Sequence, residues 1–179
     1  MSTKTKQKPP VDPPKDERAK DQAKAQYNSI AEMVKRLNHV GKDFNSADCQ
    51  LTDAEIYAGL GLYYKKGHPT HGQMPTDEQM EEYHDEDSAR QSINEDPLSV
   101  EVRSGWYRPG DKPDDEEYMI LLCTGGPAVR IVGNLGPYSE PQTARLEYQD
   151  WFTPWEEYRL DHEEEQVLVQ YAQQFYYGD

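Results

Sequence analysis

The sequence predicts an α+β fold with N-terminal helices, a four-stranded antiparallel meander and a C-terminal helix packed on the sheet. In the first half of the chain, apolar residues recur at every third or fourth position, which is typical of amphipathic helices. After residue 97 they alternate with polar residues, as in half-buried strands, and near the C-terminus the helical spacing returns. Short connections rich in Gly and Pro favour hairpins, so consecutive strands are expected to pair.

Composition divides the 179 residues into three parts, of which the last two are expected to form one domain. Residues 1–15 are rich in Lys and Pro, with Val11 as their single aliphatic side chain, which predicts a disordered basic tail. Residues 16–96 are predicted to be a helical region. Residues 97–179 are predicted to hold the sheet and the last helix.

Three helices are expected before the sheet. The first spans about residues 16–39, where Ala, Tyr, Ile, Val and Leu recur at helical spacing. The second spans about residues 53–65 and is opened by Thr52, which stands three positions before a Glu as in a capping box. The third begins after Thr76 and continues to about Asn94, since a Pro follows soon afterwards.

Four strand candidates follow, each separated from the next by turn-forming residues. They are LSVEVRSGWY (98–107), EYMILLCT (117–124), PAVRIVGNL (127–135) and TARLEYQDW (143–151). A last helix is expected over residues 161–177. Its apolar face, which should cover the sheet, consists of Val167, Leu168, Tyr171, Ala172 and Phe175.

Charge is distributed unevenly along the chain. Residues 1–45 hold ten Lys/Arg against six Asp/Glu, a net charge of +4, whereas residues 46–179 hold nine against twenty-eight, a net charge of −19. Such an imbalance destabilises the compact state by self-repulsion, so it serves solubility or the recognition of a basic partner. The acidic body, residues 46–179, is expected to repel nucleic acid. The basic arm, residues 1–45, is expected to be a solubilising tail or, alternatively, to contact a nucleic acid backbone.

The acidic residues concentrate between Asp77 and Glu117, where fifteen carboxylates face four Lys/Arg. On the predicted third helix, positions four apart lie about 6 Å apart along the axis. Two rows result, one of Asp77, Glu81 and Asp85 and one of Glu78, Glu82 and Glu86, and the following loop adds Asp114, Asp115, Glu116 and Glu117. Duplex DNA carries one charge per ~1.7 Å of axis, so these rows predict a DNA-mimicking surface. The alternative is a solvated helix face that only keeps the protein soluble.

Aromatic residues gather between Tyr148 and Tyr158, where a strand gives way to a turn. Trp151 and Trp155 are the candidate partner-binding residues there, because Trp is favoured as an interface anchor. The alternative is a secondary core beneath a loop. Aromatic anchors with carboxylates beside them are suited to binding a basic groove on a partner protein.

Motifs for catalysis or cofactor binding are not found. The sequence has no P-loop, dinucleotide fingerprint or GxSxG turn, so no catalytic residue, metal ligand or cofactor is predicted. A weaker alternative, a metal-dependent hydrolase, would use His68 and His71 with nearby carboxylates, although their spacing matches no known metal motif. Cys49 and Cys123 form no CxxC pair, and no apolar run approaches the ~20 residues of a membrane span, which favours reduced thiols and a cytoplasmic location with no membrane partner.

Three blocks carry a resemblance to a known group of proteins: GPAVRIVGNL (126–135), ARLEYQDW (144–151) and TPW (153–155). Together they resemble small uncharacterised acidic proteins encoded on bacterial phages and integrative elements, over about residues 97–179. The resemblance implies no catalytic residues, but it implies a genomic setting in which accessory proteins often counter host restriction or CRISPR systems. The expected function is therefore a non-enzymatic inhibitor of a host nucleic-acid-binding defence complex, acting through an acidic, DNA-mimicking surface. The alternative is a mobile-element adaptor or regulatory interaction module whose acidity is only solubilising.

Overall fold

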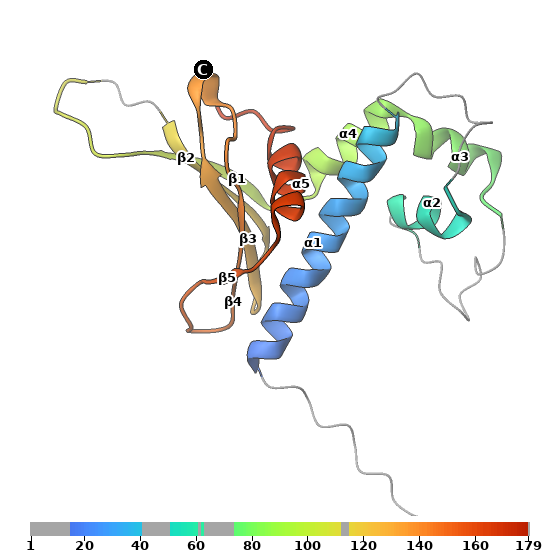
Figure 1. Cartoon of the computed structure of the whole chain (residues 1–179), viewed down its shortest axis with the longest axis horizontal. Coiled ribbons are helices and arrows are strands. Elements are labelled where there is room, and N and C mark those ends of the chain that lie inside the picture. The colour runs from blue at the N-terminus through green and yellow to red at the C-terminus, as the bar shows by residue number, and fades with distance from the viewer. Residues whose placement is uncertain (1–14, 41–50, 61, 63–73, 112–114, 179) are drawn as a thin grey trace, which may run out of the picture.

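A computed structural model describes residues 15–40, 51–60, 62, 74–111 and 115–178 of the chain. Five α-helices lie in these ranges: α1 (Lys15–Val40), α2 (Asp53–Gly59), α3 (Asp77–His84), α4 (Glu86–Glu95) and α5 (His162–Ala172). The long helix α1 separates the sheet from α2 and α3, whereas α4 crosses α1 towards α5 (Figure 1). Ile93 of α4 accordingly lies in the same core as the sheet. The predicted tail lies outside the described residues except for Lys15, which begins α1. Cys49, His68, His71 and Asp114 also lie outside them.

The sheet is an antiparallel meander with the strand order β1-β2-β3-β4-β5. Its strands are β1 (Ser99–Ser104), β2 (Asp115–Cys123), β3 (Ala128–Asn134), β4 (Arg145–Gln149) and β5 (Glu156–Tyr158). The α+β class and the four predicted strands are confirmed, but the count of four was wrong. The added strand β5 pairs with β4, with Tyr158 opposite Leu146. Because β5 has only three residues, two of them Glu, it is too short to show an alternating pattern.

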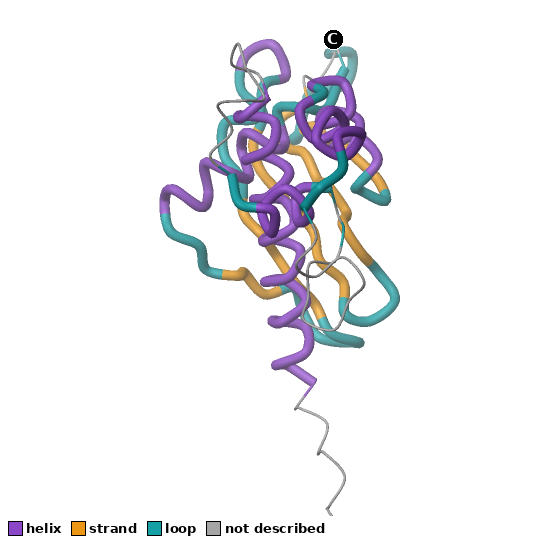
Figure 2. Tube along the Cα trace, turned by 90° about the vertical axis from the view of Figure 1, so that its right-hand side faces the viewer, coloured by secondary structure: helices purple, strands orange, loops and turns teal. Residues whose placement is uncertain are grey.

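Helices α1 and α5 cover one face of the sheet (Figure 2). Alternate strand residues point into this layer, and the helices supply the opposing apolar side chains. The buried cluster includes Tyr118, Ile120, Val129, Ile131 and Leu146 from the strands, and Ile30, Val34, Leu168 and Tyr171 from the helices. The predicted covering of the sheet by the C-terminal helix is therefore confirmed. The opposite face of the sheet, which we call the open face, carries the charged side chains.

Two predicted helices end earlier than expected. Helix α2 stops at Gly59, where an added Cβ would overlap the ring of Tyr83, so the close packing of α2 on α3 uses this glycine. Helix α5 stops at Ala172. The chain then folds back, and Tyr177 donates a hydrogen bond from its hydroxyl to the Ala172 carbonyl (2.8 Å) while its ring packs on Tyr118.

The predicted continuous helix from Thr76 to Asn94 is two helices that meet at Asp85. Thr76 caps the first of them as expected, through a capping box with Gln79. Asp85 has an extended backbone (φ −81°, ψ 120°), and its carboxylate accepts a hydrogen bond from the Ser88 amide at 2.8 Å. Asp is a strong N-cap and a poor residue for a helix interior, so it ends α3 and opens α4. None of the helices in the described ranges has the length and apolar character of a membrane span.

Candidate functional site

Seven carboxylates surround the bend between α3 and α4, and we call this surface the acidic corner. Its members are Asp77, Glu78, Glu81, Glu82, Asp85, Glu86 and Asp87, and all seven are exposed. Of these, only Glu86 forms an ion pair with a described residue, through a 2.8 Å contact between its Oε1 and Arg90 Nη2. The other six carboxylates have no basic side chain of the described chain within ion-pair distance. The corner therefore presents nearly uncompensated negative charge to the solvent.

The bend at Asp85 changes the shape of this surface. Asp77 with Glu81 and Glu78 with Glu82 still lie one turn apart on α3. Asp85 caps the helix end and Glu86 belongs to the first turn of α4, so the two straight rows expected from one helix are not formed. The carboxylates instead follow a corner made by two short helices.

A buried arginine holds the corner in place. Arg36 of α1 is only 2% exposed, and its guanidinium donates to the Tyr83 carbonyl (2.9 Å), to the Glu82 carbonyl and to the Ser88 hydroxyl (2.9 Å). Carbonyls in the last turn of a helix lack partners within that helix, so Arg36 satisfies the C-terminus of α3. Burial lowers the pKa of Arg36, and the nearby negative charge of Glu82 opposes that shift. Sequence reasoning placed Arg36 among the solvated residues of the basic arm and missed this role.

The described loop carboxylates, Asp115, Glu116 and Glu117, do not join the acidic corner. Figure 1 shows the described part of the β1–β2 connection, residues 105–111, and α3 at opposite ends of the molecule. Asp115 is half-buried at the start of β2, Glu116 is exposed, and Glu117 forms an ion pair with Arg103 of β1. The hydrogen bond from Arg103 lowers the pKa of Glu117. The predicted surface spanning residues 77–117 is therefore two separate surfaces.

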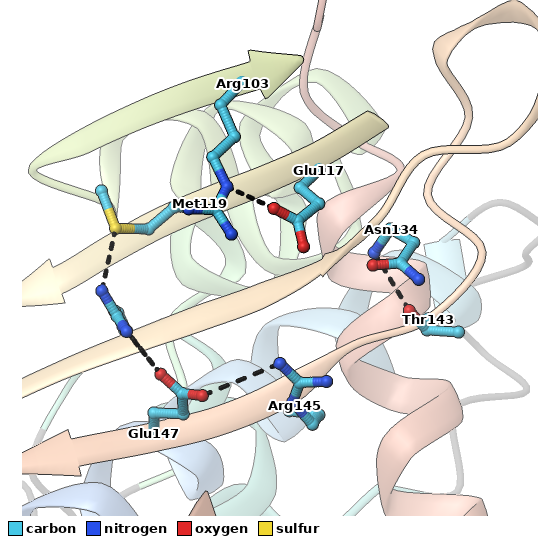
Figure 3. Close-up of polar contacts among 8 residues, drawn as sticks. Arg103, Glu117, Met119, Asn134, Thr143, Arg145 and Glu147 are labelled. Carbon is cyan, nitrogen blue, oxygen red and sulfur yellow. Dashed lines mark hydrogen bonds and ion pairs between the residues drawn. The ribbon is translucent and has the colours of Figure 1, made fainter. Parts of the chain in front are cut away.

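The open face of the sheet contains a hollow of about 320 Å³. Met119 and Val132 are half-buried in its lining, and charged side chains from neighbouring strands stand beside them (Figure 3). The charged lining residues are Glu101, Arg103, Glu117, Arg130, Arg145 and Glu147. Three of the six Lys/Arg that the structure describes after residue 46 therefore lie here. The hollow therefore combines a small apolar floor with a rim of charged side chains.

Ion pairs order the side chains of the open face. Glu147 accepts from Arg130 at 2.8 Å and lies 3.9 Å from Arg145, so one carboxylate joins two arginines of adjacent strands (Figure 3). The guanidinium of Arg130 also stacks on the Trp155 ring, 4.0 Å from its centroid. Trp155 therefore belongs to the open face and fixes the orientation of Arg130 by a cation–π contact.

Trp151 has different neighbours from Trp155. Its indole packs against Gly126 in the β2–β3 turn, where φ is +83° and an added Cβ would overlap the ring. The adjacent Phe152 is almost fully exposed and has a φ of 62°, which is uncommon for a residue other than glycine. The two tryptophans thus mark separate positions, Trp155 on the open face and Trp151 at the tip of the β4–β5 turn.

Groups suited to metal binding or nucleophilic chemistry are sparse in the described chain. No three His, Cys, Asp or Glu side chains in those ranges are arranged to hold a metal ion. Cys123 is half-buried beside Gln22 of α1, and burial raises the pKa of its thiol, which disfavours the nucleophilic thiolate. No family model, curated protein or solved structure matches the chain.

Proposed function

We propose that the chain is a non-enzymatic inhibitor that binds a basic, nucleic-acid-binding defence complex, such as a CRISPR effector or a restriction enzyme, through the acidic corner. The observation that supports this function is the set of seven exposed carboxylates, of which only Glu86 has an ion-pair partner among the described residues. An inhibitor of this kind needs charge that remains available to a partner, and the acidic corner provides it.

The local geometry suits the imitation of a phosphate backbone. Carboxylates one helical turn apart on α3 are separated by about 6 Å along the axis, within the range over which duplex DNA presents several charges. The capping box of α3, the Asp85 cap of α4 and the buried guanidinium of Arg36 hold the two short helices, so the carboxylates are arranged before a partner arrives. Complementary charge would then accelerate association with a basic groove.

The experiment measures binding to a panel of purified CRISPR effector complexes and restriction enzymes. The test variant reverses two exposed carboxylates of the corner, Glu78→Lys and Glu81→Lys, and the matched control reverses Glu95→Lys and Glu140→Lys, which are exposed elsewhere. We expect the corner variant to slow association with the bound complex about tenfold or more, because steering depends on local charge. The control, with the same net charge, should associate nearly as fast as the original chain.

A second candidate function, an adaptor whose acidity is only solubilising, is favoured by the hollow on the open face. An adaptor would bind its partner through Arg130 and Trp155, whose contacts already fix their orientation. Replacement of Trp155 by Ala would then abolish binding while the Glu78→Lys and Glu81→Lys changes leave it intact. Equal slowing by the corner variant and its control would show dependence on net charge alone and would contradict a specific acidic corner.

A further inference from the structure

Strand β1 forms one edge of the sheet and, within the described chain, pairs with β2 alone. Apolar side chains are exposed along this edge and just beyond its ends: Leu98, Val102 (39% exposed) and the fully exposed Trp106. An edge strand presents unpaired N–H and C=O groups that can template another strand, and proteins normally shield such edges. The position of these apolar groups makes β1 a candidate site for pairing with another strand.

The sequence of β1 is complementary to itself in one antiparallel register. When Val102 lies opposite Val102 of a second copy, Glu101 lies opposite Arg103 of that copy, and Arg103 lies opposite its Glu101. Leu98 and Trp106 lie beyond the two ends of β1, each four residues from Val102, so a two-fold axis at Val102 brings the apolar end of one copy towards that of the other. Opposite charges and apolar pairs directly across from each other each stabilise a sheet.

Both nearby registers that preserve the faces of the strand are unfavourable. One of these registers places Glu101 opposite Glu101 of the second copy, and the other places Arg103 opposite Arg103 of the second copy. Like charges directly opposite each other are destabilising, so charge selects the register centred on Val102.

This register also places the open faces of the two sheets on the same side. Glu101 and Arg103 point to the open face, where Arg103 already pairs with Glu117 of β2. The Arg103 side chain is 77% exposed, which leaves room for a second carboxylate on its other side. Val102 points to the opposite face, where it meets Val102 of the second copy, while Val100 lies opposite Ser104 of that copy. A two-fold axis perpendicular to the sheet satisfies all of these pairings at once.

We propose that the chain forms a symmetric homodimer in which β1 pairs antiparallel with β1 of a second copy, in the register centred on Val102. The two sheets become one ten-stranded sheet, and the two hollows lie on the same continuous open face. This dimer does not depend on the proposed inhibitory function, because it uses β1 and leaves the acidic corner free.

The first test measures mass by sedimentation equilibrium at 150 mM salt, where repulsion between two chains of net charge −15 is screened. The original chain should show twice its 20.7 kDa mass. Glu101→Arg and Arg103→Glu each place like charges together at two symmetric positions, and we expect each to weaken the dimer about tenfold or more. The double exchange, Glu101→Arg with Arg103→Glu, restores opposite charges and should restore the dimer, whereas the control Glu140→Arg should leave the mass unchanged.

The second test identifies the register. Opposed residues in antiparallel strands have Cα atoms about 4.5–5.5 Å apart, within the range for a disulfide. Val102→Cys should therefore form a covalent dimer on mild oxidation. Ser99→Cys should not, because in this register residue 99 lies far from residue 99 of the second copy. The unaltered chain with its native Cys49 and Cys123 gives the background level of cross-linking.

Three results would overturn the proposal. A monomeric mass for the original chain at 100 µM and above would exclude a stable dimer. A dimer that persists unchanged in correctly folded Glu101→Arg and Arg103→Glu chains would show that another surface is used. Equal cross-linking of Val102→Cys and Ser99→Cys would contradict the register. Far-UV circular dichroism establishes that each variant is folded before its mass is interpreted.

Discussion

Six of the seven carboxylates of the acidic corner have no ion-pair partner among the described residues, whereas on the open face Glu117 and Glu147 each pair with an arginine. The negative charge of the corner is therefore largely unpaired, while these two carboxylates of the open face are held in ion pairs. Electrostatic attraction at a distance depends on unpaired charge, and a defined binding shape depends on fixed side chains. If the chain has the proposed function, we expect the corner to act mainly on the rate of association and the open face on the geometry of the bound state.

The two regions also differ in what supports them. The open face is built on strands whose opposite side is the main hydrophobic core. The acidic corner is attached to the second half of α1, chiefly through Arg36 and the buried Tyr83 and Ala89, which lie outside the main core cluster. Only the end of α4, at Ile93, reaches that core. A region with fewer buried apolar contacts opens more easily, so the corner is expected to exchange its amide hydrogens faster than the sheet.

The largest expected effect comes from Arg36→Met. The substitution removes several charge-assisted hydrogen bonds and takes the guanidinium donor from the Tyr83 carbonyl, which costs about 3 kcal/mol of the free energy of unfolding. The Glu82 carbonyl keeps its hydrogen bond from the Asp85 amide (3.3 Å). Urea denaturation measures that loss, and hydrogen exchange should locate it in α3 and α4 while β2 and β3 stay protected.

The adjacent Lys35→Met is the matched control. Lys35 is exposed and pairs with Glu55 at 2.8 Å, and exposed pairs contribute roughly 0–1 kcal/mol. Equal destabilisation by the two substitutions would contradict the role assigned to Arg36, as would loss of protection across the whole sheet in the Arg36 variant.

A smaller effect is expected on the open face, where two arginines share one carboxylate. Arg130 is 24% exposed and stacks on Trp155, whereas Arg145 is 54% exposed and lies at the limit of ion-pair distance from Glu147. Arg130→Ala should destabilise the fold by about 1–2 kcal/mol, since it removes a partly buried ion pair and a cation–π contact. Arg145→Ala should cost less than about 0.5 kcal/mol. Thermal unfolding compares the two, and a larger loss for Arg145 would reverse their assigned roles.

The smallest effect concerns pH and the contact between α1 and α2. The hydrogen bond from Lys35 lowers the pKa of Glu55 to about 2, from an ordinary value near 4.5. A lowered carboxyl pKa stabilises the folded state above pH 4.5, and this stabilisation disappears as pH falls from 4.5 towards 2. Glu55→Gln keeps the cap at Thr52, so its melting temperature should lie slightly below that of the original chain at pH 6, and the gap should narrow below pH 4.5 and close once the pH is below about 2. A constant gap across that range would contradict the ion pair.

The main features of the fold could be predicted from sequence because they depend on local patterns. Alternation of apolar residues identified β1 to β4, and capping residues at Thr52 and Thr76 located the starts of two helices. The bend at Asp85 could not be predicted, because an acidic residue within a helical pattern is equally consistent with the charged face of one continuous helix. Its capping role depends on which backbone amide its carboxylate finds.

The support beneath the candidate site could not be predicted in the same way. Nothing near Arg36 in the sequence shows that it is buried, because its partners lie 46 to 56 residues later in the chain. The pairing of Arg130 with Glu147 and Trp155 similarly required the register of three strands. The sequence predicted six of the seven carboxylates of the acidic corner, all but Asp87, and the structure shows the contacts that hold them together.

The most direct test of the acidic corner as a DNA mimic is competition with DNA for one binding site. Fluorescence anisotropy of a labelled duplex, bound to a defence complex from the panel, is followed as the chain is added. The account predicts displacement of the duplex, an apparent Kd for the chain that rises in proportion to duplex concentration, and loss of displacement in the Glu78→Lys and Glu81→Lys variant. Simultaneous binding of the chain and the duplex, or failure to bind any member of the panel, would contradict it.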